Sequence, residues 1–454
     1  MKQPVYRVSI FLFFLSFSCL IYTQPYPDQH YVLRVDSIYY NIETNQGIKL
    51  SDDSTYIMLE DGVTDGYVIL KPQYSQYLFN HGLPSWNGTA PDTSSSFKVQ
   101  MRFPYGASWS TWLTAGFWKN NIWSSYGATS YGGGYIDYDY VKLNSYRNAW
   151  QFKVIMTRTS AELPSPTIHS LSFFVSDNQT TSLIDMNAIV NDNPAEIFIP
   201  TTFVYQYGVD PIIGGDICSP TSVSMILKSY NIDVDPYQFA LDTHDPYFDM
   251  FGIWPRVVQN ASEFGLDGTV TRYRTWSEAR EVLENGGRIA MSVGLPLYSG
   301  HLLMLAGFTS DGRPIVHDPA KSNGYSYIFN KTSLSQSWFS KGGIAYTFYP
   351  AGLFPTSVEE NYEDFVADGY TLYQNYPNPF NPSTTISFSI LKAGQTKISV
   401  FDMLGREVAI LINDHLNAGV HTTVFDGKGL SSGVYIYRIE SGNFVKSKQM
   451  ILLK

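Results

Sequence analysis

The chain has 454 residues, and a length of this order favours two to four domains over a single hydrophobic core. Charged residues make up only 15% of it, aromatic residues make up 16%, and the formal net charge is −10. Because this balance is acidic and no run of Lys or Arg forms a phosphate-binding track, the composition argues against nucleic-acid binding. It is typical of exported proteins with many short β-strands.

The first residues, 1–24, predict a secretory signal peptide. Lys2 and Arg7 give it a positive start, and the apolar run from Val8 to Tyr22 is too short to span a membrane. No other segment is long and apolar enough, so we expect no transmembrane anchor in the mature chain. Cys19 leaves a lipoprotein site open as an alternative.

Residues 25–198 predict an all-β sandwich. Three tryptophans in this region, Trp109, Trp112 and Trp118, allow two interpretations. They form either an exposed platform for a cell-surface glycan or part of the sandwich core, and we favour the core. Strands are indicated by alternating apolar residues between turn residues, at Tyr56–Glu60, Tyr67–Leu70, Phe97–Phe103, Trp150–Met156 and His169–Val175.

Residues 199–350 change character and predict an α+β domain, with helices first and an antiparallel sheet afterwards. Besides a helix at Cys218, helices are expected at Trp254–Phe264 and at Ser277–Glu284, the latter with Ser277 as its N-cap. The expected strands are Arg288–Val293, His301–Phe308, Pro314–His317, Tyr325–Phe329 and Ile344–Tyr349.

The remaining chain predicts a linker and a third domain. Residues 351–371 hold several Asp and Glu residues but no Lys or Arg, which is typical of a solvated linker. Residues 372–454 predict a small immunoglobulin-like β-sandwich, with strands at Thr384–Ile390, Lys397–Phe401 and Val434–Ile439.

Cys218 is the only cysteine that remains after removal of the signal peptide, and it lies at the start of a predicted helix. Ser219 is expected as the N-cap and Pro220 in the first turn. The positive end of the helix dipole favours the thiolate form at this position. An unpaired cysteine in an exported protein is either buried and inert or a reactive thiol, so its neighbours decide between the two.

A cysteine nucleophile needs a base, and His301 is the best candidate because it opens an apolar strand directly after Gly300. Ser310 to Arg313 predict a hairpin turn. With an even-numbered loop, Asp318 falls opposite Leu303 or Leu305, on the face of His301. Opposite Leu303 it would be a diagonal neighbour of His301, within side-chain reach. His317 then points to the other face.

The site also needs hydrogen-bond donors for an oxyanion. The backbone N–H of Cys218 is one such donor, and the side-chain amide of Gln206 is the natural second. Each residue alone has an ordinary structural role, as a buried cysteine, a strand cap or a turn residue. Cysteine followed by histidine and then a carboxylate or amide is, however, the chain order of papain-like peptidases. Such a site uses no cofactor and no metal.

The motifs around these residues resemble those of the bacteriocin-processing cysteine peptidases, family 39, and most closely the exported C39-like branch. They are Gly214-Gly-Asp-Ile-Cys-Ser-Pro-Thr-Ser-Val-Ser-Met225, Gly300-His-Leu-Leu-Met-Leu-Ala-Gly-Phe308 and His317-Asp-Pro319. The resemblance implies a papain-like fold with Cys218 as nucleophile, His301 as general base, Asp318 as orienting residue and Gln206 as oxyanion donor. The preceding β region is similar to the sandwich found ahead of the peptidase in that branch.

The tail resembles the type A C-terminal sorting domain of the type IX secretion system. The resemblance rests on Asn375-Tyr-Pro-Asn-Pro-Phe-Asn-Pro382, Phe401-Asp-Met-Leu-Gly-Arg406 and Ser432-Gly-Val-Tyr-Ile-Tyr437. It implies recognition by the type IX machinery, passage through the periplasm and across the outer membrane, and then release or attachment at the cell surface.

The sequence therefore predicts a secreted or cell-surface cysteine peptidase that hydrolyses peptide bonds in a peptide or protein substrate. Two alternatives remain. One is an amide acyltransferase on the same fold. The other is a surface adhesion or glycan-binding protein with an inactive peptidase-like domain.

Overall fold

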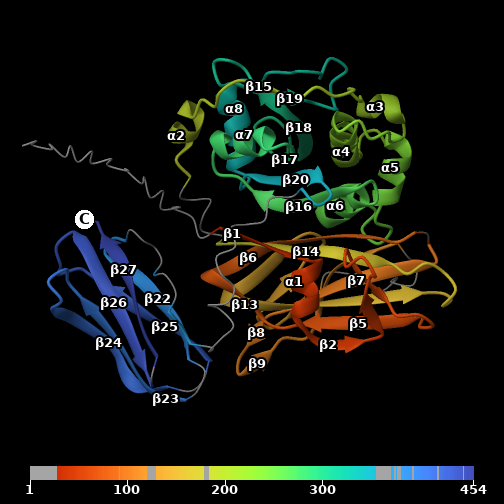
Figure 1. Cartoon of the computed structure of the whole chain (residues 1–454). Coiled ribbons are helices and arrows are strands. Elements are labelled where there is room, and N and C mark those ends of the chain that lie inside the picture. The colour runs from red at the N-terminus through yellow and green to blue at the C-terminus, as the bar shows by residue number, and fades with distance from the viewer. Residues whose placement is uncertain are drawn as a thin grey trace, which may run out of the picture.

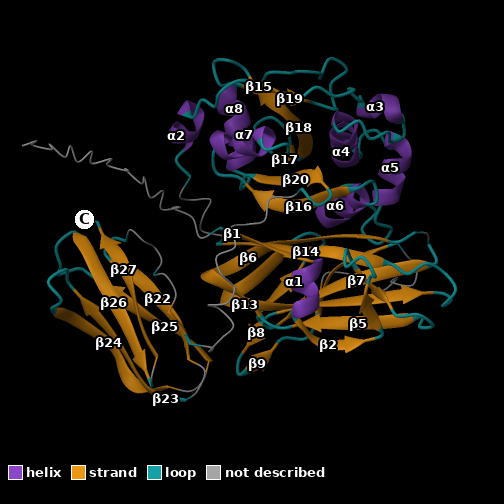
Figure 2. Cartoon of the chain, viewed as in Figure 1, coloured by secondary structure: helices purple, strands orange, loops and turns teal. Residues whose placement is uncertain are grey.

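The computed structural model describes residues 28–91, 93–119, 129–177, 184–353, 370–372, 375, 380–390, 393–416, 419–442 and 444–453. The predicted signal peptide with Cys19, and residues 354–369 of the predicted linker, lie outside the described residues. The structure is mostly β and has several sheets and separate hydrophobic cores, which confirms a multidomain protein (Figures 1 and 2).

The N-terminal β unit (residues 29–176) is built almost entirely of strands around its own core (Figure 2). The long strand β13 connects its two layers, because its first half pairs with β6 and β12 and its second half with β5 and β7. Its elements are β1 (Gln29–Arg34), α1 (Val35–Tyr40), β2 (Ile42–Gln46), β3 (Ile48–Leu50), β4 (Ile57–Leu59), β5 (Asp65–Leu70), β6 (Gln73–Thr89), β7 (Ser95–Arg102), β8 (Pro104–Tyr105), β9 (Ser108–Trp109), β10 (Leu113–Trp118), β11 (Thr129–Tyr131), β12 (Gly134–Ile136), β13 (Val141–Arg158) and β14 (Thr167–Ser176).

The three tryptophans of this unit divide between the core and the surface. Trp118 is fully buried, and its Nε1 donates to Glu263 Oε1 at 2.7 Å, so the core interpretation holds for this residue. Trp109 and Trp112 are partly exposed, and the guanidinium carbon of Arg102 lies 5.3 Å and 4.4 Å from the centres of their rings. Their ring faces therefore hold a cation of the same chain.

The central unit (residues 197–350) contains an antiparallel sheet in the order β15-β18-β17-β20-β16, with β19 paired to β18. Helices pack around this sheet (Figure 1). Its elements, with the preceding helix α2 (Met186–Asn191), are β15 (Ile197–Phe198), α3 (Gln206–Val209), α4 (Cys218–Ser229), α5 (Pro236–Thr243), α6 (Trp254–Ser262), β16 (Leu266–Arg272), α7 (Trp276–Glu284), β17 (Arg288–Val293), β18 (His301–Phe308), β19 (Pro314–His317), α8 (Lys331–Phe339) and β20 (Ile344–Pro350).

Two local predictions for this unit are wrong. Helix α7 begins one residue before Ser277, and its N-cap is Thr275, whose hydroxyl accepts from the Glu278 N–H at 3.1 Å. The segment Tyr325–Phe329 forms no strand, because only Tyr327 bridges to Val316 before the chain turns into α8. Helices α5 and α8 and strand β16 are further elements that the sequence pattern did not predict.

The central unit packs against the β unit through α6 and β16, which lie along β6 and β14 (Figure 1). Leu83 and Phe174 of the β unit are part of the buried core of the central unit. Asn87 closes the edge of β16 as a strand would, because its side chain accepts from the Gly268 N–H at 2.9 Å and donates to the Gly268 carbonyl at 2.8 Å. The two units therefore share a continuous, hydrogen-bonded interface.

The C-terminal unit has a core of its own between a sheet β21-β22-β25 and a sheet β24-β23-β26-β27. Its strands are β21 (Thr371–Leu372), β22 (Ser383–Ile390), β23 (Gly394–Phe401), β24 (Glu407–Leu416), β25 (Gly419–Asp426), β26 (Gly433–Ser441) and β27 (Phe444–Leu452). In the part of the chain that the structure describes, no helix has the length and apolarity that a membrane span requires.

Candidate active site

Cys218 is the first residue of α4, so the helix begins two residues earlier than an N-cap at Ser219 predicts. The capping position is Ile217, which offers no side-chain cap. The Ser219 hydroxyl instead shares a buried hydrogen bond of 2.7 Å with the Tyr346 hydroxyl of β20, which ties the start of the helix to the sheet. Cys218 itself is partly exposed and is not in a disulfide.

His301 and Asp318 form a hydrogen-bonded pair at the end of the central sheet. His301 Nε2 lies 2.9 Å from Asp318 Oδ1, and both side chains are buried. Asp318 Oδ1 also accepts from the Ala320 N–H at 3.0 Å, and Asp318 Oδ2 accepts from the Tyr298 hydroxyl. The carboxylate thus has donors on both oxygens, which fixes the orientation of the imidazole.

The electrostatics of this pair favour an imidazolium beside a carboxylate. Burial lowers the pKa of His301, but hydrogen bonds to Asp318 and to the Cys218 side chain outweigh it and raise this pKa to about 9. Burial raises the pKa of Asp318, but hydrogen bonds from His301 and Tyr298 hold it below the usual range. Since Nε2 of His301 is bonded to Asp318, the other ring nitrogen is the one available to Cys218.

A β-bulge brings His301 and Asp318 together. The Thr309 N–H donates to the Arg313 carbonyl at 2.9 Å, and three loop residues lie between them. The loop of this hairpin therefore has an odd number of residues, and the predicted even-numbered loop is wrong. The register then shifts between Leu305 and Gly307, which leaves Met304 opposite His317. One residue further along, Asp318 comes opposite Leu303, which is one of the two positions that the sequence predicted. The bulge compensates for the odd-numbered loop, so Asp318 keeps the predicted face.

His317 is not part of this group. Its ring stacks on Tyr325 with the ring centres 4.6 Å apart, and its Nδ1 accepts from the Ser326 N–H at 3.0 Å. Burial lowers the pKa of His317 to about 4, which keeps the ring neutral. His301 therefore stays the candidate base of the two.

Gln206 bonds two segments of the candidate site, the residue after Asp318 and the loop before Cys218. Its backbone N–H donates to the Pro319 carbonyl at 2.9 Å, and its side-chain Nε2 donates to the Gly214 carbonyl at 2.6 Å, in the loop before Cys218. The side chain is buried, and its Oε1 has no hydrogen-bond partner among the described residues. One amide hydrogen therefore remains for another acceptor.

Sequence reasoning missed Tyr298, which contacts the group, and Lys341, which bonds the strand residue that pairs with His301. The Tyr298 ring lies 4.4 Å from the His301 ring, centre to centre, and its hydroxyl bonds Asp318; burial and Asp318 raise its pKa, so it remains a donor. Lys341 donates to Ser292 Oγ at 3.1 Å and to the Val293 carbonyl at 3.3 Å. Val293 pairs with His301 in the sheet. Tyr298 precedes His301 by three residues, and that short spacing is the only signal the sequence offered.

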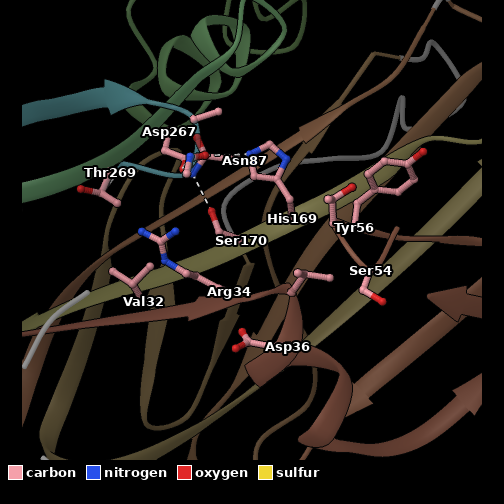
Figure 3. Close-up of a pocket in the computed structure, with 14 residues that line it drawn as sticks. Val32, Arg34, Asp36, Ser54, Tyr56, Asn87, His169, Ser170, Asp267 and Thr269 are labelled. Carbon is pink, nitrogen blue, oxygen red and sulfur yellow. Dashed lines mark hydrogen bonds and ion pairs between the residues drawn. The ribbon is translucent and has the colours of Figure 1, made fainter. Parts of the chain in front are cut away.

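A separate cavity of about 620 Å³ lies where the β unit meets the central unit (Figure 3). His169 Nε2 and Asp267 Oδ1 are 2.9 Å apart at its wall, and Asp267 Oδ2 accepts from the Gly352 N–H at 2.9 Å. Arg34 and Asp36 add further charges to the lining (Figure 3). The lining contains none of the predicted site residues, so this cavity is distinct from the group around Cys218.

Two segments of the chain match known protein families. Residues 199–346 match the model of the Peptidase_C39 like family, and residues 374–453 match that of the secretion system C-terminal sorting domain. The first match contains Cys218, His301 and Asp318. A search of curated proteins finds no match.

Similar solved structures include PorZ, a surface component of the type IX secretion system of Porphyromonas gingivalis. It is 15% identical with a TM-score of 0.14, and the match covers 36% of this chain and 22% of that chain. The chain thus spans about a fifth of that structure. The CBM51-2 and INT domains of Clostridium perfringens ZmpB match over 93% of this chain and 84% of that chain, at 9% identity and a TM-score of 0.16. The chain combines a Peptidase_C39-like segment with a C-terminal sorting domain of the type IX secretion system, which indicates export to the cell surface or secretion.

Proposed function

We propose that this protein is an exported cysteine peptidase that hydrolyses peptide bonds through Cys218, His301 and Asp318. The observation that carries the proposal is the buried imidazole of His301, whose Nε2 lies 2.9 Å from Asp318 Oδ1 and whose pKa is raised by Asp318 and by the Cys218 side chain. In this proposal the central unit is a papain-like domain over residues 199–350, flanked by a β-sandwich over 25–198 and an immunoglobulin-like sorting domain over 372–454.

The proposed reaction has two steps. The Cys218 thiolate attacks the carbonyl carbon of the substrate, and the resulting oxyanion accepts hydrogen bonds from the Cys218 N–H and from Gln206. His301 gives its proton to the departing amine as the C–N bond breaks, which leaves a thioester on Cys218. His301 then takes a proton from water, the hydroxide attacks the thioester, and the acid product leaves as the thiolate re-forms.

The Cys218→Ala variant tests this proposal. Purified wild type and variant are incubated with a proteome-derived peptide library, and new peptide termini are counted by mass spectrometry. We expect cleavage only by the wild type, and labelling of Cys218 only in the wild type by a thiol-directed peptidase probe. Equal turnover by both proteins would contradict the proposal.

The acyltransferase alternative differs only in the group that attacks the thioester. An amine in place of water gives a new amide instead of an acid. Adding amine nucleophiles to the reaction and measuring the ratio of the two products distinguishes them. A predominance of amide at millimolar amine would favour a transferase.

The glycan-binding alternative is favoured by Trp109 and Trp112, which are partly exposed on the β unit beside Arg102. Binding of the intact chain to cell-surface glycans that is lost in Trp112→Ala, without any labelling of Cys218 by the peptidase probe, would support it. The hydrogen-bonded pair of His301 and Asp318 argues for the peptidase instead, since an inactive peptidase-like domain does not require this pair.

A further inference from the structure

Helix α4, which begins with Cys218, has four buried side chains with a hydroxyl group in its first two turns. They belong to Ser219, Thr221, Ser222 and Ser224. Burial of a hydroxyl group is costly unless the group makes a hydrogen bond, and alanine is the better helix former at such a position. The hydrogen bonds of these side chains therefore decide what each hydroxyl contributes.

Two of the four hydroxyl groups make no hydrogen bond to another element of the described chain. Ser224 Oγ donates to the Pro220 carbonyl at 2.9 Å, four residues earlier in the same helix. Thr221 Oγ1 has no hydrogen-bond partner among the described residues. Neither hydroxyl group connects α4 to the sheet.

Ser222 connects α4 to the strand that begins with His301. Its Oγ donates to the Leu302 carbonyl at 3.0 Å, and this contact is buried. Leu302 follows His301 directly in β18. Because Ser222 comes four residues after Cys218, the two residues lie on one face of the helix, with a rise of about 6 Å between them. The hydrogen bond therefore joins the helical turn of Cys218 to the strand position next to His301.

A second hydrogen bond holds the start of the helix. The hydroxyl groups of Ser219 and Tyr346 are 2.7 Å apart, and Tyr346 lies in β20. Strands β20 and β18 lie on the two sides of β17 in the sheet. Since Ser219 and Ser222 bond different strands, the two hydrogen bonds together restrict rotation of α4 about its axis. Loss of the bond from Ser222 removes half of this restriction on the side of His301.

We propose that Ser222 is a positioning residue of the Cys218 site, which holds the Cys218 sulfur within reach of the His301 ring through its hydrogen bond to the Leu302 carbonyl. The inference rests on the proposed peptidase function. Ser222 itself neither contacts the substrate nor transfers a proton in this proposal. Displacement of a nucleophile from its base by about 1 Å can reduce a rate by about 10²-fold, so a bond that fixes their separation affects the rate strongly.

Ser222→Ala and Ser224→Ala are a matched pair that tests the proposal on the intact chain. Each variant removes a buried serine hydroxyl of α4 and one hydrogen bond to a backbone carbonyl, of 3.0 Å or 2.9 Å. The two variants should therefore lose a similar amount of stability in urea unfolding. Only Ser222→Ala should reduce kcat of peptide hydrolysis, by about tenfold or more, with KM within about twofold of the wild type. Values of kcat are corrected for the folded fraction.

The outcomes separate this inference from the function on which it depends. If peptides are cleaved and kcat is unchanged in Ser222→Ala, or falls equally in both variants, Ser222 has no positioning role. A higher KM with unchanged kcat in Ser222→Ala would place Ser222 in substrate binding and would also overturn the proposal. If Cys218-dependent cleavage of every peptide is absent, the peptidase proposal itself fails, and this inference fails with it.

Discussion

A β-carbon placed on Gly307 would lie 1.9 Å from the carbonyl oxygen of Ile197, so the backbones of β18 and β15 meet where only glycine fits. Gly307 also has a φ of +149°, which other residues rarely adopt. The bulge beside it is held by the Ala306 carbonyl, which accepts from the Ile199 N–H at 2.7 Å. This contact sets the register that brings Asp318 to His301.

Gly307→Ala should therefore damage both the fold and the site. We expect the free energy of unfolding to fall by about 2 kcal/mol or more, because a methyl group cannot fit against Ile197 without a backbone shift. We also expect kcat/KM of the remaining folded protein to fall at least tenfold, because the His301–Asp318 geometry changes. Urea unfolding and peptide hydrolysis measure the two effects.

Gly300→Ala is the matched control for this substitution. Gly300 precedes His301 directly, yet a β-carbon there meets no atom within 4 Å. We expect little change in either measurement. Equal losses in the two variants would show that the bulge at Gly307 has no special role.

The pH dependence of activity should reflect the link between Asp318 and His301. Since the pKa of His301 is raised to about 9, kcat/KM should fall on the alkaline side with a midpoint near pH 9. In Asp318→Asn the charge that raises this pKa is lost, so the midpoint should move toward the ordinary histidine value of about 6.5. The loss at neutral pH should be on the order of 10²-fold.

The free energy of unfolding should also decrease as the pH rises through the pKa of His301. The pKa of folded His301 is above that of the unfolded chain, so its contribution to stability is complete below about pH 6.5 and is lost as the pH rises through 9. Asp318→Asn should flatten this decrease. Asp311→Asn, at an exposed site of the same hairpin, is the control, and a similar flattening there would contradict the assignment.

The sequence predicted that Asp318 lies within reach of His301, and the structure explains why. Cys218, His301 and Asp318 each lie at the end of a regular element, where local pattern and spacing are informative. The bulge at Ala306 was not predictable, because it depends on β15, which is distant in sequence. The N-cap at Ser219 was wrong because its hydroxyl is used by Tyr346, also distant in sequence.

The local sequence pattern could not predict the contacts between the β unit and the central unit. Nothing around Asn87 distinguishes it from an ordinary strand residue, and its hydrogen bonds to Gly268 follow only from the packing of the β unit on the central unit. The strand expected at Tyr325–Phe329 failed for a similar reason, since the ring of Tyr325 is used to cover His317. Tertiary contacts overrode local propensity at both places.

Tyr298→Phe tests the second donor to Asp318. The phenyl ring keeps the contact with His301, whereas the hydrogen bond to Asp318 Oδ2 is lost. We expect the protein to remain folded and to lose about 1 kcal/mol of transition-state stabilisation, which is about fivefold in kcat/KM. Tyr325→Phe is the control, because Tyr325 stacks on His317 outside the group; a comparable loss there would contradict a specific role for Tyr298.

Asn87→Ala tests whether the β unit and the central unit unfold together. It removes two hydrogen bonds to the Gly268 backbone and one of 2.8 Å to Ser170, all of them buried. Because buried backbone groups of β16 lose their partners, we expect a loss of about 3 kcal/mol. Tryptophan fluorescence, which reports on both units, should show one shared unfolding transition at lower urea.

Asn45→Ala is the matched control for the interface. The Asn45 side chain bonds both backbone groups of Ile48 in the same way, at 2.7 Å and 3.1 Å, but it is exposed and lies within the β unit. We expect a loss of about 1 kcal/mol or less. Two separate transitions in Asn87→Ala, with the central unit unaffected, would show that the interface contributes little to stability.

Gln206→Ala separates a role in oxyanion binding from a role in holding the loop before Cys218. If the free amide hydrogen of Gln206 reaches the oxyanion, kcat should fall by roughly 10²- to 10³-fold with little change in KM. If Gln206 only holds Gly214, the loss should appear in the free energy of unfolding instead. Both quantities are measured on the same preparation, and kcat is corrected for the folded fraction.

Gln259→Ala is the matched control for this experiment, because the two glutamines have the same local contacts. The Gln259 amide also donates to a glycine carbonyl, that of Gly88, at 2.7 Å, and its Oε1 is likewise buried without a partner among the described residues. Removing either side chain should therefore cost a similar amount of stability. Only Gln206→Ala should lower kcat of the folded protein, and an equal fall of kcat in both variants would leave the Cys218 N–H as the oxyanion donor without help from Gln206.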